Sequence, residues 1–93
     1  MIWEKSVIRI ARKCVLATVL VKRGYSLRKL EHGNVLVDDL GSVVVKECFW
    51  YDKIEKIGGN AIDFFMRFEK KSFTEAMEIL LPKNKEGIEL KRS

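Results

Sequence analysis

Few side chains in this 93-residue sequence are of the types that perform acid–base or nucleophilic catalysis. The one histidine, His32, lies in the turn-like segment LEHGN, where a polar surface residue is more common than a general base. Ser26 and Ser42 have no base beside them in the sequence, and Ser72 is well placed to cap a helix. We therefore expect a protein that is not an enzyme.

Patterns for metal or phosphate binding are also weak. Asp38 and Asp39 could hold a hard cation, but no further oxygen ligands follow with the spacing of a calcium loop, so a turn explains them better. Gly58 and Gly59 precede a helix start, where backbone N–H groups can approach a phosphate, but the rest of the GxGxxG pattern is missing. We interpret the glycine pair as a close-packed junction between sheet and helix, with a phosphate cradle as the alternative. Neither a metal nor a cofactor is expected.

The overall charge is the one global property that indicates a partner. Eighteen Lys and Arg against 13 Asp and Glu give a net charge of +5, and clustered cations attract polyanions such as nucleic acids. The longest uncharged apolar run is closed by Lys22 and Arg23 and is too short to span a membrane. The charged N-terminus is also unlike a signal peptide, so we expect a cytoplasmic protein in which Cys14 and Cys48 are packed thiols.

The spacing of the first residues predicts one helix over residues 4–23. The face expected to be buried carries Val7, Ile10, Ala11, Cys14, Thr18 and Val21. The opposite face carries the cations Lys5, Arg9, Arg12 and Lys13. The β-branched residues of VLATVLV favour a strand, which is the alternative for this segment. Gly24, which follows two cations, is typical of a helix end.

Residues 25–51 change to short apolar runs separated by turn residues, which predicts a small antiparallel sheet. The runs are YSLRKL, VLV and SVVVKECFWY, and residues 38–41 between the last two are a predicted hairpin connection. Side chains alternate between the faces of a strand, so either Trp50 alone or Phe49 with Tyr51 can face outward. We favour an outward Trp50.

Two helices are predicted after the sheet. Asn60 is a good N-cap with Asp63 three residues later, which predicts a helix over residues 60–70. Ser72 and Glu75 repeat this pattern before a second helix that ends ahead of Pro82. One face of each helix is apolar, first at Ala61, Phe64, Phe65 and Phe68 and then at Phe73, Ala76, Met77, Leu80 and Leu81.

These elements together predict an α+β fold. An N-terminal helix is followed by a small antiparallel sheet, with two C-terminal helices packed on the sheet. Residues 1–82 form a single module. The charged residues 83–93 are expected to be a loosely ordered tail, in which Ile88 and Leu90 could form an edge strand.

The segment GGNAIDFFMRFEKKSFTEAMEIL resembles the C-terminal end of the zinc-binding domain of bacterial DnaG-type primases. The residues that match are Gly58, Gly59, Asn60, Ile62, Asp63, Phe64 and Met66, and then Ser72, Phe73, Glu75, Ala76, Ile79 and Leu80. The spelling GGNAIDF is closer still to zinc-free relatives at the start of primase-like proteins of plasmids, phages and conjugative elements. The resemblance covers most of residues 7–81 and is specific for the last third.

The resemblance implies a zinc-ribbon-primase-like sheet without zinc. The primase domain holds one zinc through a C-x2-H pair and a later C-x2-C pair. This chain offers at most His32 and Cys48, because Tyr51 stands where the second cysteine of the later pair would fall. Two ligands cannot close a structural zinc site, so apolar packing is expected to replace it, through Val35, Val37, Val43, Val45 and Phe49.

In primases the domain resembled here contacts single-stranded template, while the polymerising chemistry lies in a separate domain. The resemblance therefore implies a non-catalytic nucleic-acid-binding module, with single-stranded DNA favoured, from the replication or transfer system of a mobile element or phage. Bases would stack on Trp50 and Tyr51, with Phe49 as a further candidate. Phosphates would contact the cations Lys22, Arg23, Arg28, Lys29, Lys46, Lys53 and Lys56.

Two other functions stay open at this point. The first is an element-encoded interaction or inhibitory protein that binds a protein or nucleoprotein partner, which the small size and the loss of zinc favour. The basic charge argues against a mimic of DNA. The second is a structural homodimer without a nucleic-acid role, and the sequence does not reveal the oligomeric state.

Overall fold

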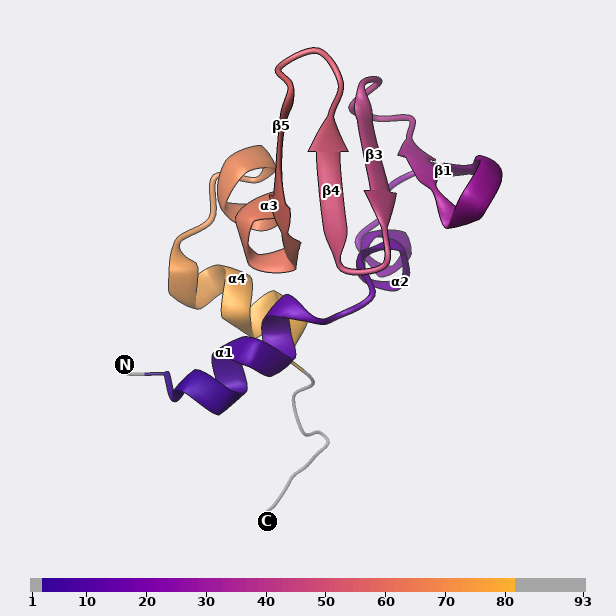
Figure 1. Cartoon of the computed structure of the whole chain (residues 1–93). Helices are drawn as coiled ribbons and strands as arrows, with labels where there is room; N and C mark the ends of the chain where they lie inside the picture. The colour runs from indigo at the N-terminus through magenta and orange to yellow at the C-terminus, as the bar shows by residue number, and fades with distance from the viewer. Residues whose placement is uncertain (1–2, 82–93) are drawn as a thin grey trace.

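The computed structural model describes residues 3–81. This part of the chain forms four α-helices, one short 3-10 helix and one five-stranded antiparallel sheet (Figure 1). In chain order the elements are α1 (Lys5–Arg12), α2 (Leu16–Lys22), β1 (Leu27–Lys29), η1 (Glu31–Gly33), β2 (Val35–Val37), β3 (Val43–Lys46), β4 (Phe49–Asp52), β5 (Ile57–Asn60), α3 (Ala61–Phe68) and α4 (Phe73–Leu80).

The predicted α+β class, with helices before and after one antiparallel sheet, is confirmed. The strands lie in the order β1-β2-β3-β4-β5, so that each pairs with its neighbours in sequence. No helix within residues 3–81 is long and apolar enough to cross a bilayer. The predicted tail of residues 83–93, with Ile88 and Leu90, lies outside the described residues.

The N-terminal helical segment is two helices, so the prediction of one continuous helix is wrong. A continuous helix would bond the backbone N–H of Leu16 to the carbonyl four residues back, but this N–H donates to the carbonyl of Glu47 (2.9 Å). The break turns the following helix so that Leu16 and Leu20 are fully buried. Ile10 and Val21, which the continuous helix would bury, are exposed.

The strands also differ from the prediction in two places. The run SVVVKECFWY forms both β3 and β4, joined by a tight turn in which Glu47 has a positive φ of 54°. Strand β5 was not predicted, because it contains Gly58 and Gly59 and glycine has a low strand propensity. The predicted hairpin connection between β2 and β3 is confirmed, with Gly41 donating its backbone N–H to the carbonyl of Val37 (3.0 Å).

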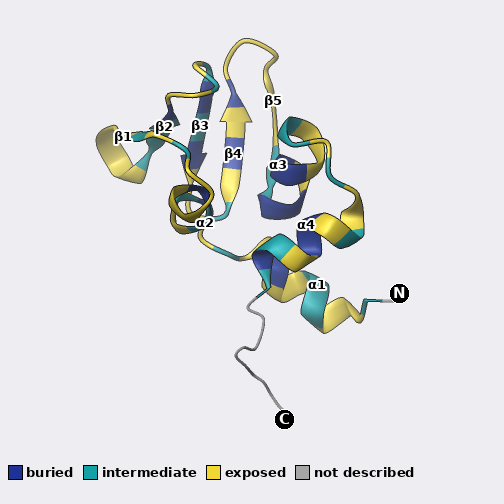
Figure 2. Cartoon of the chain, turned by 180° about the vertical axis from the view of Figure 1, so that it is seen from behind, coloured by how far each residue is buried: buried dark blue, intermediate teal, exposed yellow. Residues whose placement is uncertain are grey.

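Helices α2 and α3 pack on one face of the sheet, and no described element covers the other face (Figures 1 and 2). The covered face includes Trp50, which lies opposite Val45 and is only 5% exposed. Its indole packs edge-on against Phe64 and Phe68 of α3, with ring centroids 6.5 and 5.0 Å away. The prediction that Trp50 faces outward is therefore wrong, because this residue belongs to the core.

Both C-terminal helices begin with the predicted capping boxes. Asn60 accepts the N–H of Asp63 and donates its own N–H to the Asp63 carboxylate, both at 3.0 Å. Ser72 and Glu75 form the same pair of bonds at 3.1 and 2.9 Å. Each box satisfies two backbone donors at a helix start. Because the Asp63 carboxylate occupies the start of α3, this position is not arranged as a phosphate cradle.

The two glycines of β5 allow the strand to approach its neighbours closely. A Cβ atom on Gly58 would lie 2.6 Å from the carbonyl oxygen of Trp50. A Cβ atom on Gly59 would lie 2.6 Å from Oδ2 of Asp63, the carboxylate that caps α3. The sequence-based interpretation of a close-packed junction between sheet and helix agrees with these distances.

A half-buried carboxylate links the end of α2 to the end of α3. Glu69, whose side chain is 14% exposed, accepts hydrogen bonds from Arg23 Nε (3.0 Å) and from the Tyr25 hydroxyl (2.9 Å). Burial raises the pKa of Glu69, but these hydrogen bonds and the Arg23 charge lower it by more, so its net pKa lies below the usual value. Burial and the hydrogen bond to Glu69 raise the pKa of Tyr25 to about 12.

We expect Glu69→Gln to lower the free energy of unfolding at pH 7 by about 1 to 2 kcal/mol, because it removes a charge that accepts several hydrogen bonds. A carboxylate whose pKa is lowered by folding stabilises the protein above its unfolded pKa of about 4.3, and this contribution is lost as pH falls through the folded pKa. Urea unfolding at pH 7 and pH 3 measures both effects. The difference in free energy of unfolding between Glu69→Gln and the wild type should be smaller at pH 3 than at pH 7. Glu78→Gln, at an exposed position of α4, is the control and should leave the free energy of unfolding unchanged at both pH values.

We expect Gly58→Ala to lower the free energy of unfolding by about 1 to 3 kcal/mol, because the new methyl group meets backbone atoms that cannot move aside. Thermal or urea unfolding followed by circular dichroism checks this. Glu55→Ala, at an exposed position in the preceding loop, is the control and should stay within about 0.5 kcal/mol of the wild type. Equal stability of the two variants would contradict the close packing of β5.

Candidate nucleic-acid interface

The uncovered face of the sheet, called here the bare face, is defined by the strand register. Residues directly opposite each other in antiparallel strands lie on the same face. One row across all five strands is therefore Arg28, Leu36, Val44, Tyr51 and Gly58. A second row contains Lys46, Phe49 and Asn60.

Two aromatic rings stand on the bare face. Phe49 and Tyr51 are 59% and 47% exposed, and both belong to β4, which Figure 2 shows in alternating exposed and buried colours. Residues two apart on a strand are about 6.8 Å apart, so each ring can contact a different planar group. Leu36 and Val44 beside them are half-buried. The expectation that Phe49 packs in the sheet core is thus wrong, while Tyr51 is exposed as its predicted role requires.

Four of the predicted cations lie on this face or at its edge. Arg28 and Lys46 belong to the two rows, and Lys46 lies directly opposite Phe49. Lys53 and Lys56 are exposed in the connection between β4 and β5. Lys46, Lys53 and Lys56 lie along or beside β4 with the two rings, whereas Arg28 lies on β1, three strands away across the same face. Arg28 is partly neutralised there, since its guanidinium lies 3.4 Å from an Asp38 carboxylate oxygen.

The other three predicted cations lie elsewhere. Lys22 and Arg23 stand at the end of α2, in the helical layer behind the sheet, and Arg23 is engaged by Glu69. Lys29 follows Arg28 on β1, so its side chain faces away from the bare face. Their positions do not support the predicted role in the same interface.

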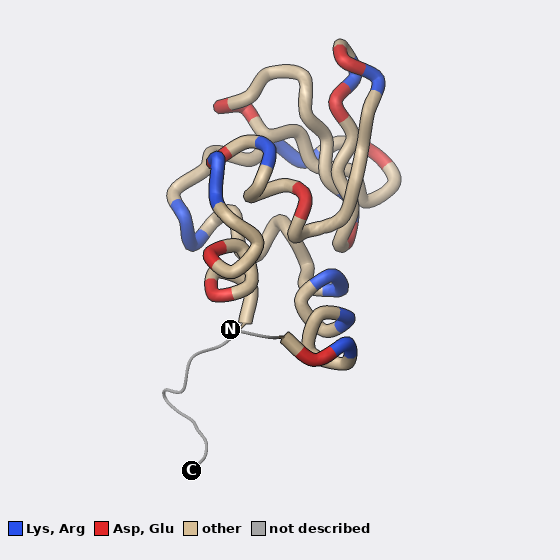
Figure 3. Tube along the Cα trace, turned by 90° about the vertical axis from the view of Figure 1, so that its left-hand side faces the viewer, with Lys and Arg blue, Asp and Glu red and all other residues tan. Residues whose placement is uncertain are grey.

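Sequence reasoning missed a set of cations on α1 as site residues. Lys5, Arg9, Arg12 and Lys13 are all exposed. The Lys and Arg positions of α1 follow one side of the helix, and this is the side of the molecule toward which the bare face is turned (Figure 3). The sequence does show these cations, as the charged face of the predicted N-terminal helix. The break after α1, which the sequence does not show, is what brings the C-terminal end of α1 beside the sheet.

A cleft of about 660 Å³ joins the end of α1 to the bare face. It is lined by Val15 and Phe49, by the cations Arg12 and Lys13, and by Glu47 of the β3–β4 turn. The mixture of apolar surface and positive charge suits a flat apolar group carried on an anionic chain. Glu47 is the one lining residue with the opposite charge.

Asp52 is a buried carboxylate whose hydrogen-bond donors belong to the β2–β3 connection and to the loop after β4. Asp52 is 7% exposed and accepts hydrogen bonds from the Ser42 hydroxyl (2.9 Å) and from the backbone N–H groups of Ile54 (3.0 Å) and Glu55 (3.2 Å). Burial raises the pKa of Asp52, but these donors lower it by more, so the net pKa lies below the usual value and the carboxylate stays ionised. Among residues 3–81 no three His, Cys, Asp or Glu side chains gather as metal ligands would.

Comparisons of the chain with protein-family models, with curated proteins and with solved structures returned no match. The resemblance to the primase zinc-binding domain therefore stays a prediction from the sequence. The candidate interface rests on the geometry and charge of the chain itself.

We expect Trp50→Ala to lower the free energy of unfolding by about 3 to 5 kcal/mol, as for other large core residues. Trp50→Phe should cost much less, because the ring contacts with α3 are largely kept and the removed Nε1 is a buried donor that has no partner among the described residues. Tyr51→Ala should remain within about 1 kcal/mol of the wild type. Urea unfolding of the three variants distinguishes the core ring from the surface ring, and a Trp50→Ala variant as stable as Tyr51→Ala would contradict the assignment.

Proposed function

We propose that this chain is a non-catalytic nucleic-acid-binding module that places a single strand, DNA in the first instance, across the bare face of its sheet. The observation that carries the proposal is the pair of exposed rings, Phe49 and Tyr51, on a strand with cations at both ends. Stacking of a base on an aromatic side chain contributes about 1 to 3 kcal/mol, and the cations neutralise the phosphates between bases.

The proposed path of the strand follows β4. It begins at the loop that carries Lys53 and Lys56, crosses Tyr51 and Phe49, and ends in the cleft beside Arg12 and Lys13. In this path the end of α1 takes the role that the sequence suggested for the end of α2. The exposed rings likewise replace Trp50 as the stacking surface.

The charges along this path support modest and salt-sensitive binding. Glu47 repels a phosphate that enters the cleft, and Arg28, on β1 away from the path, is already paired with Asp38. Five cations, namely Arg12, Lys13, Lys46, Lys53 and Lys56, carry no ion pair within residues 3–81. Affinity therefore depends on stacking as well as on charge.

The resemblance to the primase zinc-binding domain implies the same kind of ligand, since that domain contacts single-stranded template. A setting in the replication or transfer of a mobile element or phage, and a metal-free sheet, follow from this resemblance alone. The second candidate function, binding of a protein or nucleoprotein partner, is favoured by the apolar side chain of Ile54, which is 74% exposed beside the same surface.

We expect the protein to bind a fluorescent single-stranded oligonucleotide with an affinity that falls as salt rises. Contacts from five cations predict a slope of about −3.5 in a plot of log affinity against log salt concentration. Tyr51→Ala should weaken binding about 5- to 150-fold, the equivalent of one lost base stack. Fluorescence anisotropy at several salt concentrations measures both quantities.

Two matched variants sharpen this experiment. Lys22→Ala removes a cation from the helical layer and should leave the affinity unchanged within about twofold, whereas Glu47→Gln should strengthen binding because it removes a repulsive charge. The proposed function would be overturned if no binding were measured at low salt, or if the affinity did not change with salt concentration.

A further inference from the structure

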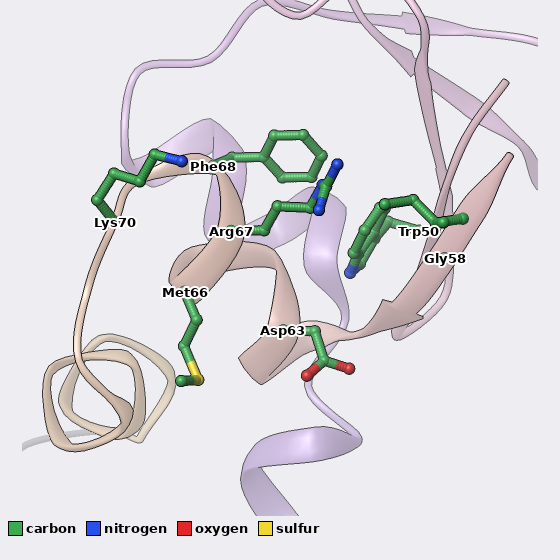
Figure 4. Close-up of a pocket in the computed structure, with 8 residues that line it drawn as sticks. Trp50, Gly58, Asp63, Met66, Arg67, Phe68 and Lys70 are labelled. Carbon is green, nitrogen blue, oxygen red and sulfur yellow. The ribbon is translucent and has the colours of Figure 1, made fainter. Parts of the chain in front are cut away.

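A groove of about 630 Å³ runs between the edge strand β5 and helix α3 (Figure 4). Strand β5 is the last strand of the sheet, so within residues 3–81 one side of its backbone has no strand partner. The side chains of Trp50, Asp63 and Arg67 turn toward the space between strand and helix. Such an exposed edge is a template for a further strand.

The indole nitrogen of Trp50 is a donor that lacks an acceptor. Its Nε1 is buried and has no hydrogen-bond partner among the described residues. The other tryptophan differs in this respect, because Trp3 Nε1 donates to the Thr74 hydroxyl (3.4 Å). A buried donor without a partner costs free energy. An acceptor in the groove that bonded to this N–H would remove the cost, and its binding free energy would be more favourable by that amount.

The remaining polar groups of the groove are complementary to an anion. Arg67 and Lys70 line it, and neither has an ion pair within residues 3–81. The one carboxylate there, Asp63, already accepts the backbone N–H of Asn60. Two cations and one buried N–H therefore lack acceptors, which a carboxylate group can supply.

We propose that this groove binds an extended acidic segment of a partner protein, which pairs with the free edge of β5 and places a carboxylate beside Trp50 Nε1, Arg67 and Lys70. Addition of a strand to a sheet edge provides backbone hydrogen bonds, and side-chain pockets next to it provide selectivity. Gly58 leaves this edge without a side chain, and the half-exposed Ile57 offers an apolar contact for an alternate side chain of the segment. The groove and the bare face share Gly58 and no other residue, so the failure of one proposal leaves the other intact.

The test follows the two indole N–H signals of the full chain by nuclear magnetic resonance. The probe is an acetylated eight-residue peptide of alternating valine and glutamate, with alternating valine and lysine as its matched control. The Trp50 indole signal, assigned with Trp50→Phe, should shift as the glutamate peptide is added. The Trp3 indole signal should stay in place, because its hydrogen bond to Thr74 is internal.

Variants and modified probes decide between the outcomes. Arg67→Ala and Lys70→Ala should each weaken binding about tenfold, the loss of one charge-assisted hydrogen bond, whereas Lys71→Ala, which faces a different hollow, should not. N-methylation of alternate peptide amides should abolish binding because it blocks strand pairing. The proposal is overturned if the glutamate peptide leaves the Trp50 signal unmoved, if the lysine or N-methylated peptide binds equally well, or if only an eight-nucleotide oligothymidylate shifts that signal.

Discussion

The pairing of Val45 with Trp50 in the β3–β4 hairpin decides which way every aromatic side chain of β4 faces. With this register Trp50 enters the layer between sheet and helices, where it meets Phe64 and Phe68. Phe49 and Tyr51 must then stand on the opposite side. A slip of one residue would exchange the two sets, placing two rings against α3 and one in solvent. The core and the candidate interface are thus two results of one register.

The same hairpin also positions the N-terminal helices. The carbonyl of Glu47 in its turn accepts the N–H of Leu16, which starts α2 at that point and separates it from α1. Since α1 is no longer continuous with α2, its last cations, Arg12 and Lys13, reach the cleft beside Phe49. One backbone hydrogen bond therefore links the packing of α2 to the charge near the rings.

Features that depend on neighbouring residues could be predicted from the sequence, and those that depend on distant partners could not. The capping boxes at Asn60 and Ser72 are local patterns and are present as expected. The break after α1 could not be foreseen, because the acceptor that causes it lies 31 positions away, from Leu16 to Glu47. Alternation limited the orientation of β4 to two choices, but the choice itself depends on α3.

The candidate site shows the same division. Tyr51, Lys46, Lys53 and Arg28 could be chosen from composition and strand alternation, whereas the roles of Lys22 and Arg23 could not be judged without Glu69. The part played by α1 required knowledge of where its end lies in space. Residue type alone therefore did not identify which of the predicted side chains lie together on one surface.

The order of the strands has a consequence for how the chain acquires its structure. Because β1 to β5 follow one another across the sheet, every strand pair closes only a short loop. The loop-closure entropy lost in forming the sheet is therefore small. The contacts that span the described chain, such as Trp3 with Thr74 and Cys14 with Leu80, join the residues on either side of α1 to α4. The hairpin contacts of the sheet are local and therefore favour rapid folding, whereas the contacts between the two ends of the described chain are long-range and raise the contact order.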